Sequence, residues 1–430
     1  MTLGPRALAL ATISLTAPLF GALASTAHAE PQGSSADPDG ASLSAWSVLP
    51  ATTYVPGSET SGHWTTGNAA VPAPYPGQPV QGFSGTHALG DGSFLVLSDN
   101  GFGAKANSAD FLLAVHQISP ETDDVDGSGE TSYDKTVLTF SDPHRLIPWA
   151  TWRDGGCAAA GTQPNGYTCP TPDRRLTGWD FDPESLQVGR DGTLWVGEEF
   201  GPYLLHFDAS GRLLEAPIPT PGVMSPSNPT LGSATPNLAN SKGYEGMSLS
   251  PNGRVLHPML EGSTAEDKTA GMADALRIYT VRDGAFEDDF LRYRMESAAH
   301  ALGDFIQVNN HEALVIERDN GQGGASVFKR IYLVDLRDSD EDGWVTKRLL
   351  VDLMDVSNPS GLSPYGDPFT FPFFTIEDVE ILDARTIAVM NDNNFPAAGG
   401  RSATEPDENE YIEITLAEPL RVDRRVLPRG

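Results

Sequence analysis

Positive charge is scarce in this chain of 430 residues. Lys and Arg together number 28, whereas Asp and Glu number 58, so the formal net charge at pH 7 is −30. A surface this negative repels the phosphate backbones of nucleic acids, which excludes DNA and RNA as partners. The same charge repels a small anionic substrate unless a cation or a local basic cluster reverses the field at its site.

Cysteine is almost absent. The two cysteines, Cys157 and Cys169, lie in a segment rich in Gly, Ala and Pro. This segment offers too few soft ligands for a zinc site. We expect the two thiols to form a disulfide that closes a small loop, as is common in an oxidising compartment. The loop would be an insertion that could overhang the main fold.

Long hydrophobic runs are missing apart from one at the start of the chain. An apolar stretch from Ala7 to Ala24 follows Arg6, and Ala27-His28-Ala29 has the small-x-small pattern of a cleavage site. The stretch is short for a membrane-spanning helix, and Pro18 interrupts it. We therefore expect a secreted protein with no stable membrane insertion.

The chain is expected to hold one large domain, since its 39% of hydrophobic residues suffices for a sizeable core. The predicted parts are a signal peptide (residues 1–29), a disordered linker rich in Ser, Gly, Pro and Asp (residues 30–42) and a folded domain that carries the cysteine insertion (residues 43–430).

Two common hydrolase motifs are also missing. The sequence has no Gly-x-Ser-x-Gly elbow and no His-Glu-x-x-His helix. Ser84 and His87 lie three residues apart in a predicted strand, where alternation places them on opposite faces. A serine or zinc hydrolase of these types is therefore not predicted.

What the chain does have is a recurring block. Each copy begins an apolar strand near a carboxylate, continues through a short polar turn, and ends a second apolar strand in acids. The copies span residues 182–199 and 243–261, with looser ones at 82–100, 303–319 and 376–392. Repeated blocks of this kind are supersecondary units that stack on one another.

The segments between the blocks supply further strands, because they are short, partly alternating and rich in aromatic and β-branched residues. We predict an all-β fold, a β-propeller whose four-stranded antiparallel blades surround a central channel. Six blades are preferred, with five to seven allowed. The two ends of the domain, residues 43–55 and 410–416, are the candidates for the pairing that closes the ring.

The acids of the blocks are the candidate metal ligands, since the innermost strands of a propeller line its channel. Glu184, Glu245 and Glu377 stand at the start of their blocks. The acids at the end of the following strand are Asp99, Glu198, Glu199, Glu261, Glu317, Asp319 and Asp392. Whether both sets reach the same mouth stays open. Close carboxylates recruit a cation, and hard oxygen ligands favour a divalent ion, Ca²⁺ in preference to zinc.

Two basic residues lie directly beside block acids. Lys242 precedes the second block, and Arg318 follows Glu317. Either side chain could meet an anionic group at the mouth, or it could form a local salt bridge with a neighbouring carboxylate.

Several of these segments carry a resemblance to a known family. They are residues 240–247 (Asn-Ser-Lys-Gly-Tyr-Glu-Gly-Met), Glu184-Ser185, residues 198–202, Glu317-Arg318 and residues 391–395. From about Gly82 to Leu416 the chain resembles the phytase-like family, described as having esterase-like activity. The resemblance implies a secreted β-propeller hydrolase that acts on small-molecule phosphate or other esters. β-Propeller phytases, to which it is similar, use calcium to make an acidic channel accept phosphate.

The expected mechanism is metal-assisted attack by water. Glu184, Glu245 and Glu377 would hold the metal, and Arg318 or Lys242 would stabilise the developing charge.

Two alternatives remain at this stage. One is a non-catalytic binding propeller that grips a saccharide or a protein through aromatic residues such as Trp152, Trp179 and those at 371–374. The other is a propeller-type sugar lactonase, with Glu184 or Glu245 beside Asn391 and Asp392 as ligands. A monomer is expected, because ring closure removes the free sheet edges.

Overall fold

The computed structural model describes residues 40–122, 129–154, 157, 164 and 167–429. The predicted signal peptide and residues 30–39 of the predicted linker lie outside these ranges. Within them, no helix is both long and apolar enough to cross a membrane.

The regular structure of the described chain is almost entirely β, and its strands form five four-stranded antiparallel units that we call blades I to V. Blade I holds β2 (Phe83–Ala88), β3 (Phe94–Ser98), β4 (Ala114–Pro120) and β5 (Gly129–Thr139). Blade II holds β6 (Pro183–Val188), β7 (Leu194–Glu198), β8 (Tyr203–Phe207) and β9 (Ile218–Pro219). Blade III holds β10 (Gly246–Leu249), β11 (Val255–Met259), β12 (Ala275–Arg282) and β13 (Ala285–Arg294).

Blade IV holds β14 (Ala301–Gln307), β15 (Glu312–Arg318), β16 (Lys329–Ser339) and β17 (Val345–Asp352). Blade V holds β18 (Asp378–Ile381), β19 (Thr386–Met390), β20 (Asn409–Thr415) and β1 (Ser42–Leu49). Three short helical segments complete the described elements: α1 (Ala265–Thr269), η2 (Trp152–Asp154) and η3 (Gly323–Ala325).

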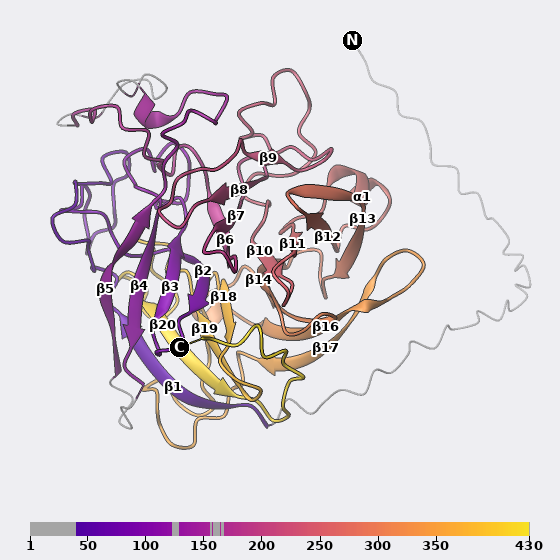
Figure 1. Ribbon diagram of the computed structural model, residues 1–430. Helices are drawn as coiled ribbons and strands as arrows, with labels where there is room; N and C mark the ends of the chain where they lie inside the picture. The colour runs from indigo at the N-terminus through magenta and orange to yellow at the C-terminus, as the bar shows by residue number, and fades with distance from the viewer. Residues whose placement is uncertain (1–39, 123–128, 155–156, 158–163, 165–166, 430) are drawn as a thin grey trace, which may run out of the picture. The chain divides into compact units, whose positions relative to one another are not determined.

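The innermost strand of each blade touches that of the next around a ring. Strand β2 contacts β6, β6 contacts β10, β10 contacts β14, β14 contacts β18, and β18 contacts β2. Figure 1 shows these five strands gathered around the centre of the ring. This is the all-β, propeller-type arrangement of antiparallel blades that the sequence predicts.

The preferred number of six blades is not confirmed. The described strands make five blades, a number within the predicted range. The interval of about a hundred residues between the turns at Asp91 and Asp191 is long enough for a further blade, and it holds β3, β4, β5, η2 and β6. Between β5 and β6, the residues that the structure describes form loops, isolated bridges and η2, and no further sheet.

The two ends of the domain close the ring. Strand β1 pairs antiparallel with β20, from Ser42 opposite Thr415 to Leu49 opposite Asn409. The predicted closure by the chain ends is therefore confirmed. Ser47 and Val48 of β1 also pair in parallel with Gly129 and Glu130 of β5, which links blades V and I at their outer edges.

The hydrophobic core lies between neighbouring blades. Along β20, Ile412 and Ile414 are fully buried, whereas Glu413 and Thr415 between and beside them are partly exposed. The two isoleucines join Leu314 of blade IV in one cluster. Because side chains alternate between the two faces of a strand, a blade packs one face against the blade before it and the other against the blade after it.

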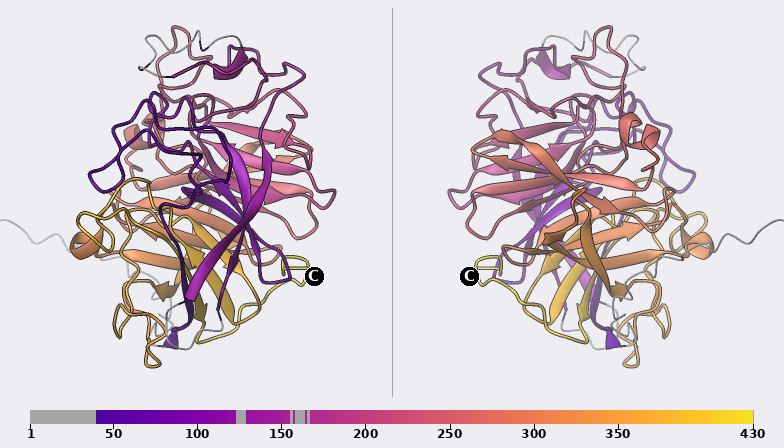
Figure 2. Two further views of the ribbon diagram at one scale, coloured as in Figure 1. Left: turned by 90° about the vertical axis from the view of Figure 1, so that its left-hand side faces the viewer. Right: turned by 90° about the vertical axis from the view of Figure 1, so that its right-hand side faces the viewer.

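The predicted disulfide between Cys157 and Cys169 is present. The nearby helix η2 lies at the outer rim of blades I and II in Figure 1, and it stays at the rim in both views of Figure 2. The described part of this insertion therefore does not overhang the channel, contrary to expectation, because it packs on an aromatic cluster at the rim that includes Trp64 and Trp152.

The closure strand offers a direct test of the fold. We expect Ile414→Ala to lower the free energy of unfolding by about 2–4 kcal/mol, because it removes a fully buried side chain at the joint between two blades. Thr415→Ala, one residue away and partly exposed, should change it by no more than about 0.5 kcal/mol. Urea unfolding followed by tryptophan fluorescence measures both, and equal effects would contradict this packing.

Candidate functional site

The pairing of the two inner strands in each blade decides where the predicted acids lie. Because these strands are antiparallel, the start of the first pairs with the end of the second. In blade II, Pro183 lies opposite Glu198, and in blade I, Phe83 lies opposite Ser98. Both sets of acids therefore reach the same end of the channel, which we call the acidic mouth.

One group of carboxylates at the acidic mouth comes from blades I and II. Asp99, Asp182 and Glu184 are buried and place one oxygen each within 4.8 Å of one another. The Asp99 side chain accepts a hydrogen bond of 2.8 Å from the amide of Gly101. It can approach only because residue 82 is glycine, with φ at +63°, where a Cβ would lie 2.2 Å from Asp99 Oδ1.

Asp182 was not among the predicted site residues. Its signal in the sequence is its place two residues before Glu184, across Pro183. Residues two apart on a strand share a face, and both acids do reach the same group.

A second group comes from blades II and III. Glu199, Glu245 and Glu261 are buried, and one oxygen of each lies within 4.8 Å of the others. Glu199 accepts a hydrogen bond of 2.8 Å from the amide of Gly243, and Lys242 Nζ forms an ion pair with Glu261.

Arg318 of blade IV joins the acids of blades III and V. Its Nη2 donates to Glu245 Oε1 at 3.1 Å and to Glu261 Oε1 at 3.0 Å, and lies 3.9 Å from Glu377 Oε1. Glu377 accepts a further hydrogen bond of 2.8 Å from the hydroxyl of Ser84. The Nε of Arg318 is buried and has no hydrogen-bond partner among the described residues.

Asp392 completes the assembly. It accepts a hydrogen bond of 2.6 Å from the amide of Asn394, and its charge raises the pKa values of Asp99 and Glu377. The predicted residues that the structure brings together are Asp99, Glu184, Lys242, Glu199, Glu245, Glu261, Arg318, Glu377 and Asp392.

Three predicted ligands lie apart from both groups. Glu198 accepts hydrogen bonds from the amides of Phe200, Gly201 and Tyr203, so it stabilises the turn after β7.

Glu317 binds the hydroxyl of Tyr293 and the Nζ of Lys347, and Asp319 pairs with Lys329. Adjacent side chains of a strand point to opposite faces, so Glu317 points away from the channel because Arg318, one residue on, points into it. For the same reason, Glu198 points away from the acidic group that Glu199 joins.

The assembly resists full ionisation. Burial raises the pKa of Glu245 to about 8, with a further rise from Glu261 that Arg318 and Lys242 oppose. Burial also raises the pKa of Glu184, with contributions from Asp182 and Glu377, and it raises the pKa of Asp392 to about 6. The donors are all carboxylate oxygens, so the chemistry of the site fits a hard divalent cation.

Asn391, which the lactonase hypothesis needs, is already engaged. Its Nδ2 donates to the carbonyl of Glu408 at 3.0 Å, and its Oδ1 accepts from the amide of Glu410 at 2.7 Å. Both polar atoms of the Asn391 side chain therefore bind the backbone that leads into β20, and its oxygen does not contact the acidic groups.

The aromatic residues of the binding-propeller hypothesis are mostly core residues. Trp152, Phe371 and Phe373 are fully buried. Phe374 is 39% exposed, and its ring lies 5.7 Å from the guanidinium carbon of Arg318. One exposed ring beside a charged cluster does not form the platform that a saccharide needs.

A protein-family model described as "Phytase-like: Esterase-like activity of phytase" matches residues 78–395, which is more than half of the chain. The chain belongs to this family. The phytase-like match covers every carboxylate of the two acidic groups.

A curated relative is an "Uncharacterized secreted protein" of Arthroderma benhamiae, 27% identical over 105 residues. The match covers 20% of the phytase-like chain and 20% of the relative, so the chain spans about a fifth of that protein's length.

Two solved structures are similar at low scores. A putative gluconolactonase has a TM-score of 0.35 and 13% identity, with 91% of this chain and 98% of that one covered. An aldose sugar dehydrogenase from Streptomyces coelicolor has a TM-score of 0.37 and 11% identity, with 86% and 100% covered. Scores in this range do not establish a shared fold; the strand pairing of the blades does so for the phytase-like chain.

The raised pKa values predict how stability depends on pH. Glu245 binds its proton more tightly in the folded protein, with a pKa of about 8 against the ordinary 4.5. Its contribution to stability is therefore full below pH 4.5 and is lost as the pH rises toward 8. In the presence of chelator, we expect the melting temperature of the phytase-like protein to fall across this range.

The variant Glu245→Gln cannot titrate at this position, so its melting temperature should depend less steeply on pH. Glu418→Gln, at an exposed position, should keep the steep dependence. A melting temperature that rises with pH between 4.5 and 8 in all three proteins would contradict the burial of these carboxyl groups.

Proposed function

We propose that this protein is a secreted hydrolase of phosphate or other esters, assisted by a divalent cation at the acidic mouth of a five-bladed propeller. The observation that carries the proposal is the convergence of eight buried carboxylates on one guanidinium and one ammonium group. Such an excess of negative charge is costly unless cations join it. Family membership supports the reaction class, since the family is described by its esterase-like activity.

Two places suit the cation, for which we propose Ca²⁺. The residues that would hold it are Asp99, Asp182 and Glu184 in one group, and Glu199, Glu245 and Glu261 in the other. When bound, a divalent cation polarises an ester oxygen and lowers the pKa of a water molecule. Its charge also lets a protein with a formal charge of −30 accept an anionic substrate.

The basic residues are placed to act on the substrate. The side chain of Lys242 is 36% exposed, so it can meet an anionic group that enters the mouth. Arg318 is buried below it, with an unused donor at Nε that can stabilise negative charge as it develops on an oxygen.

Glu377 is the candidate general base. Ser84 holds its Oε2, while its Oε1 lies at the edge of the Arg318 guanidinium. Burial, Glu245 and Asp392 raise the pKa of Glu377. A carboxylate of raised pKa takes a proton from water more readily, and the charge of Arg318 opposes the rise.

We further propose that the partner is a small molecule and that the protein is a monomer outside the cell. Ring closure by β1 and β20 removes free edges at the joint, which supports the monomer. The disulfide and the name of the curated relative are compatible with secretion.

Neighbouring acids provide a matched test of the cation sites. Glu199→Gln should weaken calcium binding about tenfold or more, since losing a ligand costs at least as much as losing a residue that supports one. Glu198→Gln removes one carboxylate from a turn that lies outside both groups, so it should lower the melting temperature but keep the calcium affinity. Calcium titration by calorimetry measures both, and equal affinities in the two variants would count against these sites.

The activity itself is tested with a panel of phosphate and carboxylic esters, in added calcium and then in excess chelator. We expect hydrolysis that chelator abolishes and calcium restores, and that Glu245→Gln loses entirely. The variant Glu418→Gln changes an exposed residue that does not belong to the acidic mouth, and it should hydrolyse the esters at the wild-type rate. Unchanged turnover in Glu245→Gln would refute the assignment, and silence of the folded protein across the panel would favour a binding propeller instead.

A further inference from the structure

The opposite mouth of the channel, where the inner strands end, is crossed by the last described residues of the chain. Asn309 of blade IV donates to the carbonyl of Arg421 at 3.0 Å, and the amide of Asp423 donates to Val308 at 3.0 Å. At the other end Pro428 lies beside Ala88 of blade I. Figure 1 shows the chain ending in front of β19 and β20, and Figure 2 shows the end on this face of the ring.

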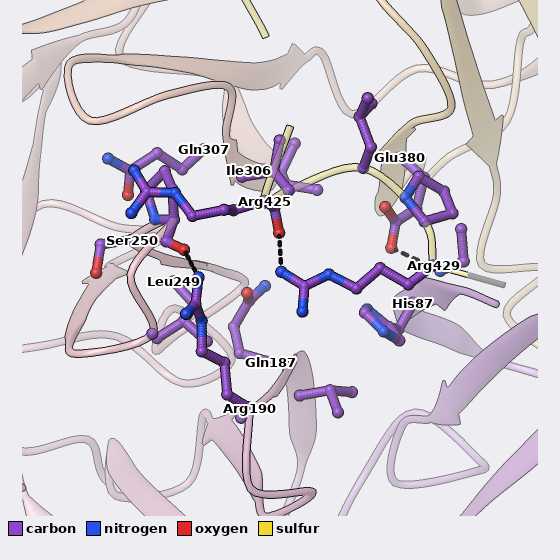
Figure 3. Close-up of a pocket in the computed structure, with 18 of the residues that line it drawn as sticks. His87, Gln187, Arg190, Leu249, Ser250, Ile306, Gln307, Glu380, Arg425 and Arg429 are labelled. Atoms are coloured by element: carbon purple, nitrogen blue, oxygen red, sulfur yellow. Dashed lines mark hydrogen bonds between the residues drawn. The ribbon is translucent and has the colours of Figure 1, made fainter. Parts of the chain in front are cut away.

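A cavity of about 270 Å³ lies beneath this segment. Residues from the ends of all five inner strands line it together with the segment itself. The polar and charged side chains that matter are Gln187, Arg190, Gln307, Glu380, Arg425 and Arg429 (Figure 3).

Two arginines of the cavity have no acid between them. In Figure 3, the guanidinium group of Arg429 points toward that of Arg190 with the amide of Gln187 between them, whereas Arg190 points toward the carbonyl of Pro251. Arg190 donates to the carbonyl of Pro251 at 2.6 Å, and Arg429 to that of Arg425 at 3.4 Å. Within the described ranges, neither forms an ion pair with a carboxylate, whereas Arg425 is paired with Asp423.

A buried amide at the cavity has an unused polar atom. Gln307 is only 2% exposed, and its Oε1 has no hydrogen-bond partner among the described residues. Because the oxygen and nitrogen of a terminal amide can exchange places, this group can present a donor to a ligand.

The remaining titratable groups at the cavity do not cancel its positive charge. Burial raises the pKa of Glu380 to about 8, so at neutral pH this carboxyl group is mostly protonated. Burial lowers the pKa of His87, which is therefore neutral. Asp423 pairs with Arg425 and also feels the charge of Arg190, so three arginines stand against one ionised acid and positive charge is in excess.

We propose that this cavity binds a small oxyanion, such as a phosphate or a phosphomonoester group, between Arg190 and Arg429. The planar guanidinium groups each offer paired donors that match the geometry of such an anion. An anion also removes the repulsion between the two like charges. Both arginine side chains are exposed, so a ligand can reach them from solvent. The site is separate from the acidic mouth and does not depend on its chemistry.

Inorganic phosphate is the probe for this site. The full chain is melted in increasing phosphate at constant ionic strength, with sodium chloride as the balancing salt and with chelator present to keep cations off the acidic mouth. We expect a saturable rise in melting temperature. The double variant Arg190→Gln/Arg429→Gln should bind phosphate about tenfold more weakly or worse, since it removes both guanidinium groups that would donate charge-assisted hydrogen bonds to the anion.

The control is Arg212→Gln/Arg424→Gln, which removes the same charge from exposed positions that do not line the cavity. It should bind phosphate like the wild type. Glu245→Gln should also keep phosphate binding, even if it abolishes hydrolysis, so the two proposals fail independently. A wild-type rise that does not saturate, or that both double variants share, would mean an adventitious ion only and would overturn the proposal.

Discussion

The attraction between one buried guanidinium group and the carboxylates around it is the constraint on which the acidic mouth depends. Arg318 ends β15 of blade IV, yet it binds Glu245 and Glu261 of blade III and lies beside Glu377 of blade V. Ring geometry brings the starts of all five inner strands together, so their acids cannot avoid one another. Removing the guanidinium would leave several buried negative charges uncompensated, which is far more costly than losing an exposed ion pair.

Part of this arrangement follows from sequence patterns alone. The all-β class, the closure of the ring by residues near both ends of the domain and the disulfide could all be predicted, because alternation and cysteine count report on them directly. The choice between Glu198 and Glu199 could not. Two adjacent acids at the end of a strand point in opposite directions, and a bulge at Pro183 in the partner strand sets which one faces the channel. Asp182 could have been predicted, because it lies two residues before Glu184 and alternation places both on one face. The blade number could not, because loops filled an interval long enough for strands.

The two mouths of the channel have opposite electrostatic character. Carboxylates dominate one end, and arginines of the C-terminal segment gather at the other. Between them lie buried acids on the inner strands, and burial raises the pKa of Asp304 to about 7 and that of Glu380 to about 8. Near neutral pH these groups hold protons much of the time. The channel between the acidic mouth and the opposite mouth therefore adds little to the negative charge of the acidic mouth.

The pairing of β1 with β20 sets the order in which the protein can be completed. Strand β1 is synthesised first, but its partner comes more than 350 positions later, so the fifth blade waits for nearly the whole chain. Until then, β1 lacks its main partner and β19 keeps an open edge. A chain cut short before residue 409 would expose both edges permanently, and exposed strand edges recruit other chains.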